Sequence, residues 1–243
     1  MRKLALTAAL LAATALPATA HLMLAEETFR DLGGTGFGAA PRLLTLQDNV
    51  FESGGTQAGA GGTTIIIPNA IAGADKSKVY SVGALGWTSG AAVGIGLDTN
   101  EIGATAGLTF QTLTLTLFDA AGNPLASFAG NGPVFITQQQ LADQQGNGNS
   151  VFDIRLSPDE QSLYNTVLAA NGGAFNVFEG LTASFGCTTP APGCGPSSDG
   201  AESFLAFNAV PGPVAGAGLP GLLAAALGLG GLGWHRRWRR RTA

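Results

Sequence analysis

Carboxylates dominate the side chains of this 243-residue chain that could do chemistry: there are sixteen Asp and Glu residues, but only two His and two Cys. A Ser-His-Asp or Cys-His site needs a positioned imidazole, and the two histidines, His21 and His235, lie near the ends of the chain. Two carboxylates facing each other across a cleft, as in glycoside hydrolases, are the catalytic chemistry left open. Sixteen acidic residues permit such a pair without indicating one, so we expect no catalytic residues and no enzyme activity.

Two oxygen-rich stretches are the candidates for a metal site. The first contains Asp98, Asn100 and Glu101, and the second contains Asp143, Asn147, Asn149 and Asp153. Ca²⁺ takes six to eight oxygen ligands, and neither stretch matches the spacing of an EF-hand loop. Turn formation by Asn, Asp and Gly explains both stretches without a metal. We therefore expect no cofactor, with a Ca²⁺ site as the alternative.

Aromatic platforms for a sugar ligand are scarce. Residues 21–209 contain one Trp, Trp87, and two Tyr, Tyr80 and Tyr164, and we expect the thirteen Phe to fill the core. Carbohydrate binding, an alternative function, would therefore depend on Trp87. The same segment has five basic and sixteen acidic residues, a net charge of −11 (5 minus 16), which opposes binding to nucleic acid.

The other basic residues are sorted to the two ends of the chain, and the first end has the layout of a secretory signal. Two basic residues precede an uncharged apolar run over residues 4–16, and a proline ends that run. Ala18 and Ala20 then supply the small residues that signal peptidase requires. We predict a signal peptide over residues 1–20, removed by signal peptidase; a buried N-terminal helix is the alternative.

The C-terminal end has the opposite order, with an apolar run followed by basic residues. Residues 214–234 are uncharged and rich in Leu, Ala and Gly, and this run is long enough to cross a hydrocarbon core of about 30 Å. The positive-inside rule places the basic residues in the cytoplasm. They are Arg236, Arg237, Arg239, Arg240 and Arg241. We predict an exported middle, one transmembrane span and a basic cytoplasmic tail; a buried glycine-rich core helix is the alternative.

Residues 210–243 resemble a PEP-CTERM sorting tail. Val210, Pro211, Gly212 and Pro213 form a short Pro-rich motif, followed by the apolar span and the Arg-rich end. Gly212 stands where the family's motif has Glu. The resemblance implies an exosortase-like processing enzyme as partner, with cutting or exchange near the motif and release to the cell surface or beyond. Without cutting, the span anchors the protein. Such proteins occur in Gram-negative bacteria that make exopolysaccharide, so the resemblance also implies an association with that polymer.

The two cysteines are interpreted as those of an exported protein. Cys187 and Cys194 enclose the sequence Thr-Thr-Pro-Ala-Pro-Gly, and in an exported protein a pair so close in sequence is typical of a local disulfide. A redox or metal pair is the alternative, but the CxxC spacing and a neighbouring His are missing. We expect a disulfide that stiffens a protruding loop.

The middle of the chain, residues 21–209, is predicted to form one β-rich domain. The clearest strand covers residues 112–118, where Thr and Leu alternate with a period of two. A turn over residues 119–124 and a returning strand over 125–128 would follow, and a bulge near Gln111 would reconcile the opposite phase of residues 108–110. Further strands are predicted over residues 43–46, 63–67, 79–87, 92–97, 151–156, 174–178, 181–185 and 203–209. This spacing is typical of a β-sandwich, of which a jelly roll is one form.

Two short helices are predicted between the strands. Thr137 and Gln140 form one capping box, and Ser157 and Glu160 form another, with Pro158 at the first helical position. We expect these helices to cover edges or ends of the sheets. Together the patterns predict an exported cell-surface or extracellular-matrix protein without catalytic activity. A carbohydrate-binding module and a carboxylate-based glycoside hydrolase are the alternatives.

Overall fold

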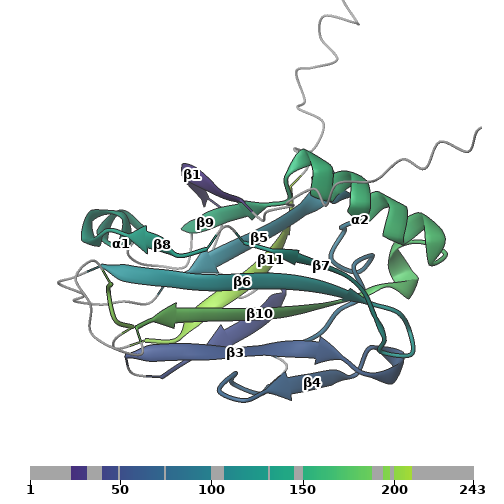
Figure 1. Ribbon diagram of the computed structural model, residues 1–243, viewed down its shortest axis with the longest axis horizontal. Coiled ribbons are helices and arrows are strands. Elements are labelled where there is room, and N and C mark those ends of the chain that lie inside the picture. Colours follow the sequence, from purple (N-terminus) through teal and green to yellow (C-terminus); the bar gives the residue numbers. More distant parts are fainter. Residues whose placement is uncertain are drawn as a thin grey trace, which may run out of the picture. The chain divides into compact units, whose positions relative to one another are not determined.

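The computed structural model describes residues 23–31, 40–48, 50–73, 75–99, 107–130, 132–144, 150–187, 194–197 and 200–209. They form a mainly β structure in which two antiparallel sheets pack as a sandwich, accompanied by two short helices (Figure 1). The predicted β-sandwich is therefore confirmed. Within the described residues no helix is long and apolar enough to cross a membrane, and the span predicted over residues 214–234 lies outside them.

One sheet has five strands in the order β1-β9-β5-β11-β2. Its members are β1 (Met23–Asp31), β2 (Arg42–Leu46), β5 (Val93–Asp98), β9 (Ser150–Arg155) and β11 (Glu202–Asn208). The last strand, β11, lies between β5 and β2, because Ser203 pairs with Asp98 on one side and with Thr45 on the other. The sheet therefore brings together strands from both ends of the described chain.

The other sheet has six strands, in the order β4-β3-β10-β6-β7 with β8 also paired to β6. Its members are β3 (Phe51–Ala58), β4 (Thr64–Ile67), β6 (Leu108–Phe118), β7 (Pro124–Ala129), β8 (Val134–Ile136) and β10 (Phe178–Gly186). The predicted bulge is confirmed, since Thr112 pairs with Ser184 and Phe110 with Phe185, which leaves Gln111 without a place in the register. The hairpin between β6 and β7 is confirmed as well.

The two helices begin at the predicted caps. They are α1 (Gln138–Gln144) and α2 (Pro158–Ala170), and short 3₁₀ turns occur at η2 (Ala60–Gly62), η3 (Gly90–Ala92) and η4 (Ala174–Asn176). The Ser157 hydroxyl accepts a hydrogen bond from the Glu160 amide at 3.4 Å, and the Glu160 carboxylate accepts one from the Ser157 amide at 2.8 Å. Helix α2 is tied to η3, because Asn165 accepts a hydrogen bond from the Gly90 amide at 2.8 Å.

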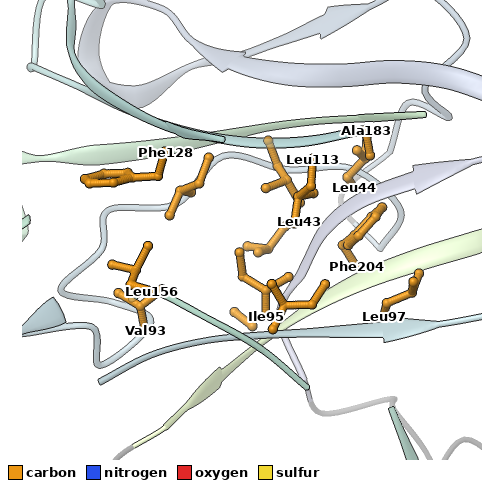
Figure 2. Close-up of a cluster of buried hydrophobic side chains, with 14 of the residues drawn as sticks. Leu43, Leu44, Val93, Ile95, Leu97, Leu113, Phe128, Leu156, Ala183 and Phe204 are labelled. Atoms are coloured by element: carbon orange, nitrogen blue, oxygen red, sulfur yellow. The ribbon is translucent and has the colours of Figure 1, made fainter. Parts of the chain in front are cut away.

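The hydrophobic core fills the space between the sheets. Leu43, Ile95 and Phe204 from the five-stranded sheet approach Leu113 and other side chains of the six-stranded sheet (Figure 2). The period-two pattern of β6 explains its part, because its leucines are buried while the threonines between them point outward. The strand predicted from that pattern is therefore confirmed together with the face it buries.

Two strand predictions are wrong. Residues 79–87 form turns and isolated bridges instead of a strand, and residues 174–178 contain the 3₁₀ turn η4 before β10 begins. In the first segment Gly86 has a φ of +74°, which ends any extended run. Its apolar residues Val82 and Trp87 are nevertheless fully buried. Val82 and Trp87 are five positions apart and both buried, so burial in this segment does not follow the period of a strand.

Strand β3 was not predicted, because its two central glycines resemble a loop. A Cβ on Gly54 would lie 2.7 Å from the backbone nitrogen of Ala70, and a Cβ on Gly55 would lie 2.5 Å from the carbonyl oxygen of Leu181. Side chains therefore do not fit at these positions without a shift of the backbone. The glycines weaken the strand signal and at the same time allow β3 to pack closely against its neighbours.

Candidate functional site

The residues proposed for Ca²⁺ lie only partly within the described chain. Outside it are Asn100, Glu101, Asn147 and Asn149, and of Asp143 only the backbone in α1 is described. Among the described residues, no three His, Cys, Asp or Glu side chains are grouped as metal ligands. The two candidates with described side chains, Asp98 and Asp153, both point to the outer face of the five-stranded sheet.

The environments of Asp153 and Asp98 differ. Arg155, two residues along the same strand, donates a hydrogen bond from Nη2 to Asp153 Oδ2 at 2.6 Å and forms a second contact from Nε to Oδ1. Burial raises the pKa of Asp98 to about 6, and the positive charge of Arg42 opposes part of this rise. The carboxylate of Asp153 is therefore held in an ion pair with Arg155, and partial desolvation explains the raised pKa of Asp98.

The predicted disulfide between Cys187 and Cys194 is present, with the two Cα atoms 6.2 Å apart. Val50 forms hydrogen bonds with residues on both sides of the disulfide loop. Its carbonyl oxygen accepts hydrogen bonds from the amides of Cys187 at 3.0 Å and Ser197 at 3.2 Å. The Val50 amide also donates to the Ser197 carbonyl at 2.9 Å. Val50 has a φ of +78°, which a β-branched residue rarely adopts. Strained backbone therefore sits where the disulfide loop meets the start of β3.

Trp87 cannot serve as a sugar platform in this structure, which corrects the expectation based on the sequence. Its side chain is fully buried, and Nε1 donates a hydrogen bond to the Phe207 carbonyl oxygen at 2.9 Å. The hydroxyl of Tyr164 donates to the Trp87 carbonyl oxygen at 2.9 Å. Trp87 therefore closes one part of the core instead of presenting a ring to solvent.

The sorting and processing residues all lie outside the described chain. They are Ala18, Ala20, Val210, Pro211, Gly212, Pro213, Arg236, Arg237, Arg239, Arg240 and Arg241. The signal peptide and the sorting tail therefore stay predictions from the sequence.

Hydroxyl groups line the outer face of the six-stranded sheet. The strand register places Ser53 of β3, Ser184 of β10 and Thr112 of β6 in one row across three neighbouring strands. Since alternate residues of a strand share a face, the rows behind it continue the pattern on β10, β6 and β7. The hydroxyl face consists of Ser53, Thr112, Thr114, Thr116, Ser127, Thr182 and Ser184.

A hollow of about 460 Å³ opens on this face near the end of β4. Strand β4 ends where Ile67 pairs with Gly55, so the first residues of β3 continue without β4 beside them. Hydroxyl-bearing lining comes from Ser53, Thr112, Thr182 and Ser184, while Phe51, Ile67, Pro68 and Asn69 line it elsewhere. None of the ten lining residues is ionisable. The volume lies within the range of roughly 300–1,000 Å³ found for small-molecule sites.

The hydrogen bonds within the hydroxyl face leave capacity for a ligand. The hydroxyl oxygens of Thr112 and Ser184 are 2.6 Å apart, and those of Thr116 and Ser127 are 3.0 Å apart. A hydroxyl has one donor and two acceptor positions, so one mutual bond leaves capacity on the exposed partners Thr112, Thr116 and Ser127, whereas Ser184 is buried. The hollow offers neutral donors and acceptors but neither an acid nor a base, so its chemistry is that of binding.

A buried acid lies on the other side of the same sheet. Glu179 pairs with Leu117 of β6 and is fully buried. Its Oε1 accepts a hydrogen bond from the Tyr80 amide at 2.9 Å, whereas Oε2 makes no hydrogen bond. Burial raises the pKa of Glu179 to about 8, although the Tyr80 amide lowers it somewhat. The carboxyl group is therefore mostly protonated at neutral pH and belongs to the core, away from the hollow.

No protein-family model, curated protein or solved structure matches this chain. A function must therefore be argued from the residues of the chain itself.

Sequence reasoning missed the residues of the hollow, although part of the signal was present. The alternation over residues 112–118 was used only for its leucines, and the threonines between them form the middle of the hydroxyl face. Ser53 was missed because β3 was not predicted. Asn69 was missed because it follows the end of β4, where no periodic pattern exists.

Proposed function

We propose that this chain is an exported component of the cell surface or extracellular matrix, without catalytic activity, that associates with exopolysaccharide. The observation that carries the proposal is the uncharged, hydroxyl-lined hollow on an exposed sheet face. A site without ionisable groups offers binding but no general acid, base or activated nucleophile. The signal-like N-terminus and the PEP-CTERM-like tail support export and delivery to the surface.

We also propose that the sandwich is a jelly roll. The order β9-β5-β11-β2 in one sheet and β3-β10-β6-β7 in the other supports it. Strands that follow one another along the chain repeatedly alternate between these sheets, as they do when a long hairpin is rolled up. In this arrangement β1 and β4 are additions at the sheet edges.

The sorting proposal is that signal peptidase removes residues 1–20 and that an exosortase-like enzyme acts near residues 211–213. The apolar segment 214–234 holds the intermediate in the inner membrane, and the Arg-rich end faces the cytoplasm. Deletion of residues 236–241, or of the processing enzyme, is expected to leave a longer form in the membrane fraction. Mass spectrometry of the membrane and matrix fractions measures this. Unchanged mass and location after both deletions would contradict the sorting assignment.

The glycoside hydrolase alternative receives little support from the described residues. Asp98 and Asp153 lie on the same sheet face, with Asp153 opposite Gly96 on the neighbouring strand. A hydrolase needs one carboxyl group on each side of the scissile bond, whereas the carboxylate of Asp153 is already paired with Arg155. An activity against the matrix polysaccharide that disappears in Asp98→Asn or Asp153→Asn would favour the hydrolase over a non-catalytic protein.

The carbohydrate-binding alternative is compatible with the proposed role, but not through Trp87. Trp87 is buried, whereas the hollow on the hydroxyl face is open to solvent. Any glycan contact is therefore better placed on the outer face of the six-stranded sheet.

A further inference from the structure

We propose that the hollow and the adjoining hydroxyl face bind a neutral polysaccharide, which crosses the strands along the row of Ser53, Ser184 and Thr112. This inference rests on the proposed association with exopolysaccharide and names the class of polymer. The juxtaposition behind it comes from three strands distant in sequence, β3, β10 and β6, which lie side by side in the sheet (Figure 1).

The spacing of the hydroxyl groups suits an extended polymer. Neighbouring strands lie about 5 Å apart, and residues two positions apart along a strand are separated by about 7 Å. In the row from Ser53 to Thr112, the middle hydroxyl of Ser184 is buried and bonded to Thr112, so Ser53 and Thr112 offer the exposed hydroxyls. Thr182 with Thr114 begins a parallel row. A sugar chain, which carries hydroxyls along its whole length, can meet such a row at several points.

The charge of the site selects a neutral ligand. The lining of the hollow has no Lys, Arg or His to pair with a uronate or a sulfate. Residues 21–209 have a net charge of −11 (5 minus 16), so an anionic polymer meets repulsion over the whole domain. A neutral chain pays no such cost, and its hydroxyls exchange water for the exposed hydroxyls of Ser53, Thr112 and Thr182.

The walls of the hollow favour a sugar over a protein partner. Phe51, Ile67 and Pro68 supply apolar surface beside the hydroxyls, and a sugar ring likewise presents C–H groups beside its hydroxyls. The residues that dominate the energy of protein interfaces are most often Trp, Tyr and Arg, and none of these lines the hollow. A second copy of the chain is therefore the weaker candidate for this face.

The test uses the full chain in detergent and native gels that contain a neutral β-glucan, neutral dextran or anionic alginate. We expect at least one neutral polymer to retard the wild type and alginate to have no effect. In the double variant Thr112→Val, Thr182→Val the dissociation constant is expected to rise about tenfold, because two neutral hydrogen bonds are lost. Valine keeps the β-branched shape, so the sheet is retained.

Two matched variants control for folding. The double variant Thr112→Ser, Thr182→Ser keeps both hydroxyls and is expected to bind within about threefold of the wild type, since no hydrogen-bonding group is lost. Thr88→Val removes a hydroxyl from an exposed threonine outside the hydroxyl face and is expected to bind as the wild type does. Thermal unfolding by circular dichroism confirms that all variants fold.

Three results would overturn the inference. These are wild-type binding by the folded valine variant, no retardation of the wild type by either neutral polymer, and a salt-sensitive preference for alginate. Dimerisation that the valine variant abolishes would assign the face to a second copy instead. A chain that reaches the matrix but binds no neutral polymer contradicts this inference alone. A chain that never leaves the inner membrane contradicts the proposed function, whatever it binds.

Discussion

The outer faces of the two sheets use the same alternating pattern in opposite ways. On the five-stranded sheet, Val151 and Leu205 point outward and are nevertheless fully buried, in a small second cluster with Ala40 and Phe207. On the six-stranded sheet, most outward hydroxyls stay at least partly exposed, such as those of Thr112 and Thr114, and only Ser184 in the hydroxyl face is buried. One outer face therefore contributes to stability, and the other is available for contact.

Two glycines of the five-stranded sheet agree with the dense packing of its outer face. On the five-stranded sheet, a Cβ on Gly94 would lie 2.3 Å from the ring of Phe207, and one on Gly96 would lie 2.6 Å from a methyl carbon of Val151. Large side chains therefore occupy the space above these glycines. Arg155 lies over the ring of Phe207, at 5.1 Å from its centroid, and adds a cation–π contact to this packed face.

The largest effect that would sharpen the comparison is expected from a truncation on the packed face. Leu205→Ala should lower the free energy of unfolding by about 2–5 kcal/mol, because it leaves a cavity among buried side chains. Thr114→Ala, at an outward position of the other sheet, should cost less than about 1 kcal/mol. Urea unfolding of both variants measures the difference. Equal losses would break the distinction between a packed and an open outer face.

A second test concerns Glu179, on the inner side of the six-stranded sheet. Its pKa is raised to about 8 in the folded protein, so its contribution is present at acidic pH and is lost as the pH rises towards 8. Between pH 5 and 7 the wild type should lose about 2–3 kcal/mol from this group. Glu179→Gln should remove that slope in urea unfolding. A variant with the wild-type slope would show that Glu179 is ionised in the core.

A smaller pH effect is expected from the outer face of the five-stranded sheet. The pKa of Asp98 is raised to about 6 by burial, so its contribution is complete below about pH 4 and is lost as the pH passes 6. Because Asp98 is partly exposed and Arg42 lies near it, we expect about 1–2 kcal/mol between pH 4 and 6. Asp98→Asn should flatten the unfolding curve in this window. An unchanged curve would contradict the desolvation of Asp98.

These two sheets also show how far the sequence could predict the fold. The alternation in β6 and the capping boxes at Ser157 and Thr137 predicted a strand and two helices, because local patterns determine these elements. Strand β3 could not be predicted in this way. Gly54 and Gly55 are needed because the backbones of Ala70 and Leu181, which are not neighbours in sequence, leave no room for a Cβ. Register and strand order likewise depend on non-local packing.

The candidate site was less predictable than the fold. The disulfide followed from the spacing of Cys187 and Cys194, whereas Trp87 was chosen for its residue type and is buried. The sequence showed the threonines of β6 but not that Ser53 and Ser184 stand in the same row. That row exists only because β10 pairs with both β3 and β6. A binding surface made of common residues has no motif until the register is known.

The place of β11 inside its sheet has a consequence for the timing of folding. Leu46 of β2 pairs with Glu202 of β11, 156 positions later (202 minus 46). This pairing closes a long loop, so we expect it to form slowly. When the chain is synthesised from its N-terminus, β2 and β5 are made long before β11, the strand that lies between them in the sheet. Their edges stay open to other chains until β11 arrives. The five-stranded sheet can therefore close only after nearly the whole domain has emerged.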